Sequence, residues 1–246
     1  MSGTRPRGVE GEAEAAGWVR SMFGSVAHRY DFLNHLLSFN LDRSWRRRTV
    51  ARVEHVLARP AARVLDLCCG TGDLLGALQE KRGAPVLGCD FCRPMLSIAR
   101  RKFGGARLVE ADALRLPFAD GSLDLVTIAF GFRNLASYRA GLEEMARVLR
   151  PGGVAAILEF SQPRGRLLPA LYSFYSRHIL PAVGRALSGS KEAYAYLPES
   201  VRRFPGAEEL ASQMREAGFG EAGYETMTGG IVALHTGKKQ AAGAPA

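Results

Sequence analysis

Short apolar runs alternate with amphipathic stretches between Arg63 and Phe160. Five runs have the length and composition of β-strands, at residues 63–67, 85–89, 106–110, 123–130 and 154–160. Between them, apolar residues recur at helical spacing over 73–81, 94–102 and 138–149. The fourth run is nearly all apolar, as is typical of a strand buried on both faces. This repetition predicts an α/β fold with a parallel sheet and right-handed crossovers.

Proline and glycine residues indicate where the later elements end, and the terminal segments indicate the limits of the domain. Pro151-Gly152-Gly153 is expected to stop the helix over 138–149. A helix is predicted at 208–217, and β runs at 224–227 and 231–236 flank two glycines, which indicates a closing antiparallel hairpin. Residues 1–17 and 240–246 are predicted to be disordered tails, and the first of these lacks the apolar stretch of a signal peptide. We therefore expect one domain over 18–239, with a helical lid at 18–56 and an insertion at 161–205.

Composition and charge exclude few classes of protein or partner. The chain has 246 residues, 47% of them hydrophobic, and no apolar stretch reaches the roughly 18 residues of a membrane helix, so a soluble cytoplasmic protein is expected. The net charge of +9 fits nucleic acid, an anionic membrane surface or no specific partner. The four cysteines are Cys68, Cys69, Cys89 and Cys92. Their spacing lacks a second zinc-binding pair, so small buried residues are favoured over a metal or redox site.

The strongest chemical motif is a strand that runs into a glycine turn and then a helix, from Val64 to Asp73. Gly70 and Gly72 allow the backbone to approach a ligand closely. Asp90 closes the next strand, 18 positions after Gly72, where a carboxylate can accept hydrogen bonds from two ribose hydroxyls. Asp112-Ala113 ends the third strand and could meet an adenine amino group, or Asp112 could simply form a turn.

A dinucleotide-binding enzyme is the first rival for this motif. Its fingerprint needs a third small residue, yet Leu75 occupies that position. The turn also carries Asp66 and Asp73. Carboxylates suit a ligand with a cationic sulfonium and an ammonium group better than they suit a pyrophosphate. From Arg63 to about Phe160 the chain resembles the class I methyltransferases that use S-adenosylmethionine (AdoMet). The resemblance implies a Rossmann-like sheet of seven strands, mostly parallel, with one antiparallel strand.

The flanking segments resemble a narrower family, the demethylmenaquinone and 2-polyprenyl-6-methoxybenzoquinol C-methyltransferases. The similarity runs from about Trp18 to Lys239. It is carried by motifs at 23–34 (FGSVAHRYDFLN), 43–46 (RSWR), 111–118 (ADALRLPF), 128–134 (IAFGFRN), 159–163 (EFSQP), 196–201 (YLPESV) and 229–235 (GGIVALH). Asn40-Leu41-Asp42 departs from the more usual glycine and histidine ahead of the Arg-x-Trp motif.

This resemblance implies C-methylation of a prenylated quinol by AdoMet. Demethylmenaquinol in menaquinone biosynthesis is the first choice, and the benzoquinol of the ubiquinone pathway remains open. The cofactor-binding residues that it implies are Asp66, Gly70, Thr71, Gly72, Asp90, Asp112, Ala113 and Ala129. The catalytic candidates are Arg133, Asn134, Tyr30, Asn34 and His28. No metal is expected, since the sulfonium already carries the driving charge.

Chemistry gives each catalytic candidate a role and an alternative. Arg133 could stabilise a quinolate oxygen as the adjacent carbon attacks the methyl group, or it could pair with an acidic neighbour. Tyr30 and Asn34, at i, i+4 on the lid, could face the substrate, or Tyr30 could serve packing. His28 is a candidate base, or a surface residue.

A prenyl tail would keep the substrate in a membrane. The segment 164–191 interleaves basic residues with aromatic and aliphatic ones, so it predicts a peripheral contact with the cytoplasmic membrane face, with a buried helix as the alternative. A methyltransferase acting on a sterol or fatty acyl chain is a second function, and an RNA methyltransferase a third. No RNA-binding module is visible, so no nucleic-acid partner is expected. The oligomeric state stays open, with a homodimer as one option.

Overall fold

The computed structural model describes residues 3, 6, 8–9, 11–163 and 191–241 of the chain. Its centre is a seven-stranded sheet in the order β3-β2-β1-β4-β5-β7-β6. The strands are β1 (Val64–Leu67), β2 (Leu87–Asp90), β3 (Arg107–Glu110), β4 (Leu123–Ala129), β5 (Leu149–Phe160), β6 (Phe219–Met227) and β7 (Val232–Lys239). β7 runs antiparallel to both β5 and β6, and the pairs among β1–β5 are parallel. The predicted fold class is confirmed.

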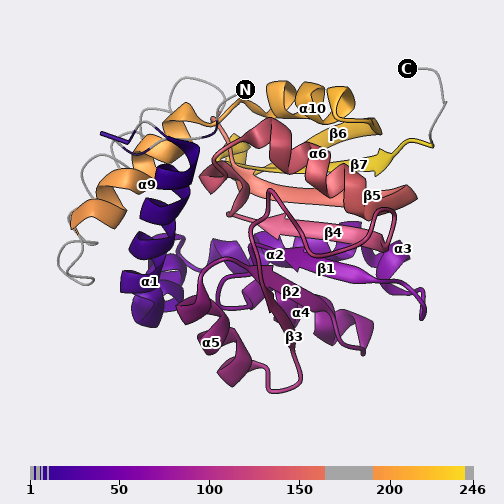
Figure 1. The fold of residues 1–246 in the computed structure, drawn as a ribbon, viewed down its shortest axis with the longest axis horizontal. Helices are drawn as coiled ribbons and strands as arrows, with labels where there is room; N and C mark the ends of the chain where they lie inside the picture. The colour runs from indigo at the N-terminus through magenta and orange to yellow at the C-terminus, as the bar shows by residue number, and fades with distance from the viewer. Residues whose placement is uncertain (1–2, 4–5, 7, 10, 164–190, 242–246) are drawn as a thin grey trace.

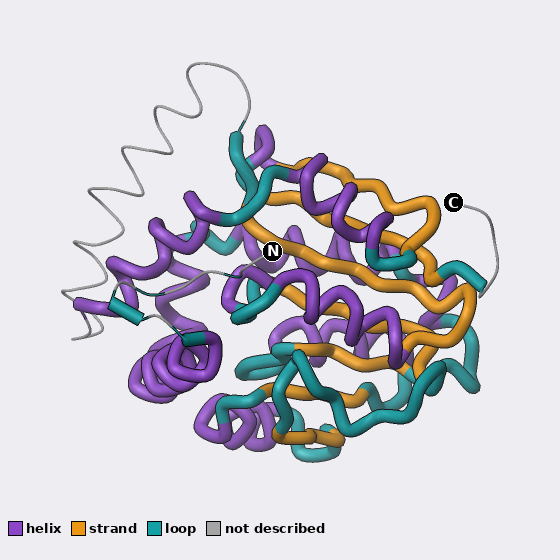
Figure 2. Tube along the Cα trace, turned by 45° about the horizontal axis from the view of Figure 1, so that its top comes forward, coloured by secondary structure: helices purple, strands orange, loops and turns teal. Residues whose placement is uncertain are grey.

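Helices cover both faces of the sheet, as Figure 1 and Figure 2 show. On one face, α6 (Tyr138–Val148) and α10 (Ala207–Glu216) pack through Leu142, Met145 and Leu210. On the other, α2 (Leu41–Arg52), α3 (Glu54–Leu57) and α4 (Asp73–Arg82) pack through Trp45 and Leu75. The central strands β1 and β4 are therefore buried on both faces, which explains why their residues are mostly apolar.

The lid begins earlier than the sequence suggested. Helix α1 (Glu12–Leu37) starts inside the predicted tail, and its residue Ala15 is buried. The Gly3 amide also donates to the Ala136 carbonyl at 2.9 Å. The prediction of a disordered tail up to residue 17 is thus wrong for residues 12–17, because α1 continues to bury small side chains there. Of the predicted C-terminal tail, residues 242–246 lie outside the described part.

Helix α1 lies across one end of the molecule beside α9 (Lys191–Arg203) and contacts α5 (Arg93–Lys102) (Figure 1). Trp18 and Tyr196 meet there with ring centroids 5.2 Å apart. Within the predicted insertion, α9 is described and residues 164–190 are not, so the predicted membrane segment falls almost wholly outside the described residues.

The helix predicted over 138–149 ends just ahead of Pro151-Gly152-Gly153, and these three residues lie within a strand. α6 ends at Val148 and β5 begins at Leu149. Leu123 pairs with Leu149, whereas Leu125 pairs with Val154, so residues 150–153 bulge out of the ladder. Proline lacks an amide donor and Gly152 has a φ of 74°, both of which a bulge accommodates. The described residues also form the 3₁₀ turns η1 (Phe132–Asn134) after β4 and η3 (Thr228–Gly230) between β6 and β7.

Candidate active site

A cavity opens where β1, β2, β3 and β4 end. Its walls come from the turns after these four strands, from α1 and from η1. They include Leu67, Cys68, Gly70, Asp90, Phe91, Ala111, Asp112, Ala113, Leu114, Ala129, Phe130, Gly131 and Asn134, with Ala16, Phe23 and Tyr30 of α1. A smaller cavity adjoins it, sharing Tyr30, Cys68, Gly70 and Ala129. Both lie at the carboxyl ends of parallel strands, where open α/β sheets bind their ligands.

Both glycines of the glycine turn take the left-handed backbone conformation. Gly70 and Gly72 have φ values of 54° and 92°. A Cβ on Gly72 would stand 2.9 Å from the Phe103 ring, so this glycine also allows α4 to pack closely. A Cβ on Gly70 would meet nothing within 4 Å, which leaves the backbone there open to a ligand. Cys68 takes the left-handed conformation without being a glycine, with φ of 50°.

Asp90 lies in the large cavity and also holds the glycine turn. Its two carboxylate oxygens accept hydrogen bonds from the Gly70 amide at 2.9 Å and the Cys92 amide at 2.8 Å. Burial raises the pKa of this carboxyl to about 6, although the backbone hydrogen bonds lower it. Each oxygen keeps further acceptor capacity. The position therefore suits the two vicinal hydroxyls of a ribose.

Asp66 faces the smaller cavity with one oxygen unpaired. Thr127 donates to its Oδ1 at 2.8 Å, while the buried Oδ2 has no partner among the described residues. Burial raises the pKa of Asp66 to about 7. An unpaired buried carboxylate oxygen is costly, and a bound cationic group would satisfy it. Asp66 thus fits the ammonium group of an amino-acid moiety.

The remaining cofactor candidates lie around these two carboxylates. Asp112 is exposed on the rim of the large cavity, where it accepts a hydrogen bond from the Leu114 amide at 2.9 Å, so it does form a turn while facing the cavity. Ala113 and Ala129 line the same cavity. Thr71 lines the smaller one, and its hydroxyl donates to Asp31 of the lid.

We expected Arg133 to face the substrate, but it is not among the described residues that line the large cavity. Its guanidinium is buried behind the wall, with Nη1 donating to Glu159 Oε1 at 2.9 Å and to the Phe130 carbonyl. The ion-pair alternative is the arrangement that the structure shows, because Glu159 is fully buried on the neighbouring strand and needs a cation. The Arg133 charge still reaches Tyr30, whose pKa is raised by burial and lowered by that charge.

Tyr30 and Asn134 do face the cavity, and each has a polar partner. Asn34 lies one turn from Tyr30 and is its hydrogen-bond partner, without lining the cavity in the described part of the chain. The Asn134 amide nitrogen donates to the Phe130 carbonyl at 3.4 Å, and the Tyr196 hydroxyl donates to the Asn134 Oδ1 at 3.1 Å. The large cavity is therefore lined by a phenol from α1 and an amide from η1.

His28 is exposed on α1 and lines neither cavity as far as the described residues form them. The structure thus shows the surface-residue alternative for His28, and its role as a base stays a prediction. The i, i+4 repeat explains why: Tyr30 and Asn34 share a face of α1, and His28 points to solvent.

The cysteines gather near the site but carry no pairing. All four are free, and three are buried. Burial raises the pKa of each thiol above its ordinary value. Protonated, desolvated thiols are poor nucleophiles, which fits small packing residues better than a redox pair.

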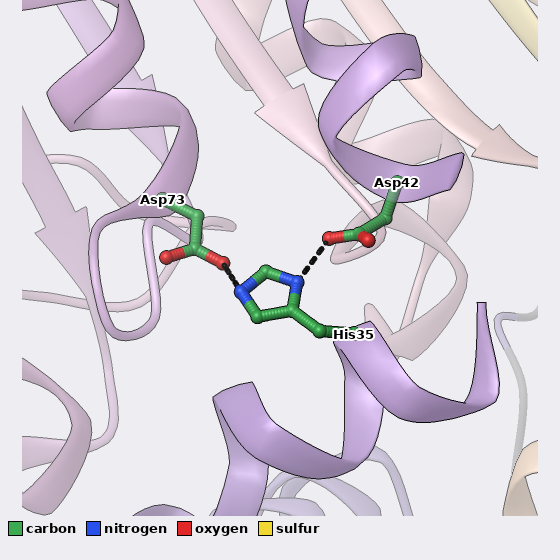
Figure 3. Close-up of side chains that lie close together, drawn as sticks. All are labelled: His35, Asp42 and Asp73. Atoms are coloured by element: carbon green, nitrogen blue, oxygen red, sulfur yellow. Dashed lines mark hydrogen bonds and ion pairs between the residues drawn. The ribbon is translucent and has the colours of Figure 1, made fainter. Parts of the chain in front are cut away.

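A charged cluster that the sequence analysis missed joins the lid to the glycine turn. His35 lies between Asp42 and Asp73, with its Nδ1 2.8 Å from one carboxylate and its Nε2 3.7 Å from the other (Figure 3). These three side chains could hold a cation, since their ligand atoms lie within 4.8 Å of one another. However, Arg46 and Lys102 already form ion pairs with the same carboxylates. The i, i+4 spacing of Asp42 and Arg46 was the available signal for this pair.

The chain matches known proteins over most of its length. Residues 10–239 match the model of the ubiE/COQ5 methyltransferase family. A demethylmenaquinone methyltransferase of Thermus thermophilus is 49% identical over 223 residues, covering 89% of this chain and 100% of the relative. A ubiquinone/menaquinone biosynthesis C-methyltransferase UbiE of Pseudoalteromonas translucida is 41% identical, covering 93% of each chain.

Solved structures agree on the fold. A SAM-dependent methyltransferase of Thermotoga maritima, described as a possible histamine N-methyltransferase, aligns with a TM-score of 0.60 at 20% identity, covering 89% of this chain and 99% of that one. At that identity the likeness concerns the fold alone. The family match and the close relatives go further, and with the glycine turn and its two buried carboxylates they show that this chain belongs to the ubiE/COQ5 methyltransferase family.

Proposed function

We propose that the protein transfers the methyl group of AdoMet to a ring carbon of a prenylated quinol, with demethylmenaquinol as the preferred substrate. The observation that carries the cofactor assignment is the pair of buried carboxylates at the ends of neighbouring strands, Asp90 for the ribose and the half-paired Asp66 for the ammonium group. The relatives at 41–49% identity, named for menaquinone and ubiquinone methylation, support the substrate class.

Bound AdoMet supplies an electrophilic methyl group on a sulfonium, so the reaction needs an electron-rich carbon held in line with it. Tyr30 and Asn134 line the large cavity, where they would hydrogen-bond the quinol oxygens. Deprotonating such an oxygen raises the nucleophilicity of the ring carbon, and nearby donors stabilise the charge. Arg133 would act through this pair, lowering the pKa of Tyr30 and fixing the turn that carries Asn134.

A prenylated substrate resides in a bilayer, so we propose that the protein associates peripherally with the membrane. Within the described residues no helix combines the length and hydropathy needed to cross a membrane. The corner between α1 and α2 does expose large apolar side chains, at Phe32, Leu36, Phe39 and Leu41. Such an exposed apolar patch suits contact with the lipid interface.

The decisive test is methyl transfer from labelled AdoMet to prenylated demethylnaphthoquinol and to prenylated benzoquinol in parallel. We expect labelled product from the naphthoquinol, with Asp90→Ala as the inactive control. Transfer to the benzoquinol alone would reassign the pathway. Transfer only to a sterol, a fatty acyl chain or RNA would overturn the proposed substrate class.

A further inference from the structure

Arg46 reaches from the lid helix α2 into the smaller cavity. It is 9% exposed, and it lines this cavity together with Asp66, Gly70, Thr71 and Asp73. Nearly burying a guanidinium is costly unless its charge is matched. Arg46 is the one lysine or arginine that lines the smaller cavity in the part of the chain that the structure describes.

The guanidinium is held firmly in place. Its Nη1 donates to Asp42, one turn earlier on α2, and Asp42 is held in turn by the Ser38 hydroxyl at 2.6 Å. The guanidinium carbon lies 5.5 Å from the centroid of the Phe130 ring. In contrast, Nη2 stands 3.7 Å from Asp73 Oδ2, which is an ionic contact but too long for a hydrogen bond. One edge of the guanidinium is thus held by Asp42, and the other edge is free to donate hydrogen bonds to a further anion.

The smaller cavity has the charges that an amino-acid group requires. The methionyl end of AdoMet carries an ammonium and a carboxylate on one carbon. Asp66 offers an unpaired carboxylate oxygen for the ammonium. The Thr71 hydroxyl already donates to Asp31. The carboxylate therefore finds its cationic partner in Arg46, whose charge also lowers the pKa of Asp66 against the effect of burial.

We propose that Arg46 binds the α-carboxylate of AdoMet, so that the lid supplies part of the cofactor site. The inference rests on the proposed use of AdoMet, and it adds a residue outside the glycine turn. Helix α2 would then contact the bound cofactor directly through Arg46. The ligand carboxylate would be the third anion around this guanidinium, beside Asp42 and Asp73. Binding of AdoMet would then fasten the lid over the glycine turn.

The test compares two ligands that differ in this one group, AdoMet and decarboxylated AdoMet, by calorimetry without any methyl acceptor. We expect the wild-type protein to prefer AdoMet by at least tenfold, as a charge-assisted, bidentate pair should give. Arg46→Gln should weaken AdoMet binding by about that factor and leave decarboxylated AdoMet within about twofold. Arg47→Gln, exposed on the same helix, serves as the matched control and should leave both affinities unchanged.

Arg46→Lys is the control for a folding defect in Arg46→Gln, because lysine keeps a positive charge beside Asp42 but lacks the planar fork of the guanidinium. It should weaken AdoMet binding partly and spare decarboxylated AdoMet. Equal losses for both ligands would show that Arg46 only holds the lid, and unchanged AdoMet binding in Arg46→Gln would also overturn the proposal. A wild-type protein that binds neither ligand would instead overturn the proposed function.

Discussion

At the scale of single residues, two buried carboxyl groups, Asp66 and Asp90, are the contacts proposed for the cofactor. Burial raises the pKa of Asp66 to about 7 and that of Asp90 to about 6. An ionised carboxylate attracts an ammonium group and accepts hydrogen bonds from hydroxyls through both oxygens, whereas the protonated form loses the charge and one acceptor. The protonation of these two groups should therefore govern cofactor affinity near neutral pH.

We expect the affinity for S-adenosylhomocysteine to be highest above about pH 7 and to fall as the pH decreases through the pKa values of Asp66 and then Asp90. Calorimetry between about pH 8 and about pH 5 would measure this, and Asp66→Asn should remove the first step. Both pKa values are raised relative to the unfolded chain, so the folded state binds more protons as the pH falls. These protonations stabilise the free protein, and the melting temperature should not fall with the affinity. A pH-independent dissociation constant would contradict the assignment.

The Arg133–Glu159 pair should matter to stability, since both side chains are buried. Arg133→Met should lower the free energy of unfolding by about 3–5 kcal/mol, because it leaves the Glu159 carboxylate without its cation. Adding Glu159→Met should recover much of that loss, since the double variant removes both charges. Denaturant unfolding gives both values. Arg139→Met, which breaks an exposed pair with Glu143, is the control and should cost under about 1 kcal/mol. A stable single variant would argue against a structural pair.

At the scale of elements, polar bonds fasten the lid on the side of the glycine turn. Lys102 of α5 donates to Asp31 of α1 at 2.9 Å and to Asp73 of α4 at 2.6 Å. Thr71 donates to the same Asp31. At the far end α1 packs on α9 through Trp18 and Tyr196. Helix α1 is thus held by charges near the cofactor site and by aromatic rings near its start.

Removing the shared cation should loosen one end of α1. In Lys102→Met, we expect amide hydrogen exchange in α1 around Asp31 to accelerate about fivefold, as a loss of about 1 kcal/mol of local stability would give. Exchange near Trp18 should change less, because the aromatic contacts remain. Lys81→Met removes the exposed pair with Glu54 and provides a comparison. Uniform acceleration along α1 would mean that the lid opens as one unit.

At the scale of the whole molecule, the large apolar side chains that are exposed among the described residues lie at one corner, between α1 and α2. Phe32 and Phe39 are 62% and 74% exposed, at the end of α1 and just beyond it. The segment 164–191, predicted from its sequence to meet a membrane, is the second candidate for the contact. The corner and this segment can therefore be tested against each other.

Vesicle co-sedimentation at low and high salt would show whether the corner or the segment 164–191 contacts the membrane. If the corner is the contact, Phe32→Ser with Phe39→Ser should reduce binding to anionic vesicles at least tenfold, since two phenyl groups no longer enter the interface. Changing Arg164, Arg166 and Arg177 to Glu tests the other segment. Arg107→Ser, exposed on the edge strand β3, is a control expected to have little effect. Undiminished binding in both multiple variants would place the membrane contact elsewhere.

The sequence by itself determined the parts of this protein that depend on local pattern. Alternating strands and helices predicted the parallel sheet, and the positions of Gly70, Gly72 and Asp90 predicted the cofactor turn, because strand periodicity and positive-φ glycines are properties of neighbouring residues. Tertiary structure alone decided which distant side chains meet. Glu159 takes the guanidinium of Arg133, 26 residues away, and Arg46 reaches the cavity of Asp66. The Pro151-Gly152-Gly153 bulge also depended on its partner strand. A buried charge or an unpaired backbone group needs a partner, and only the packing of distant segments determines which group supplies it.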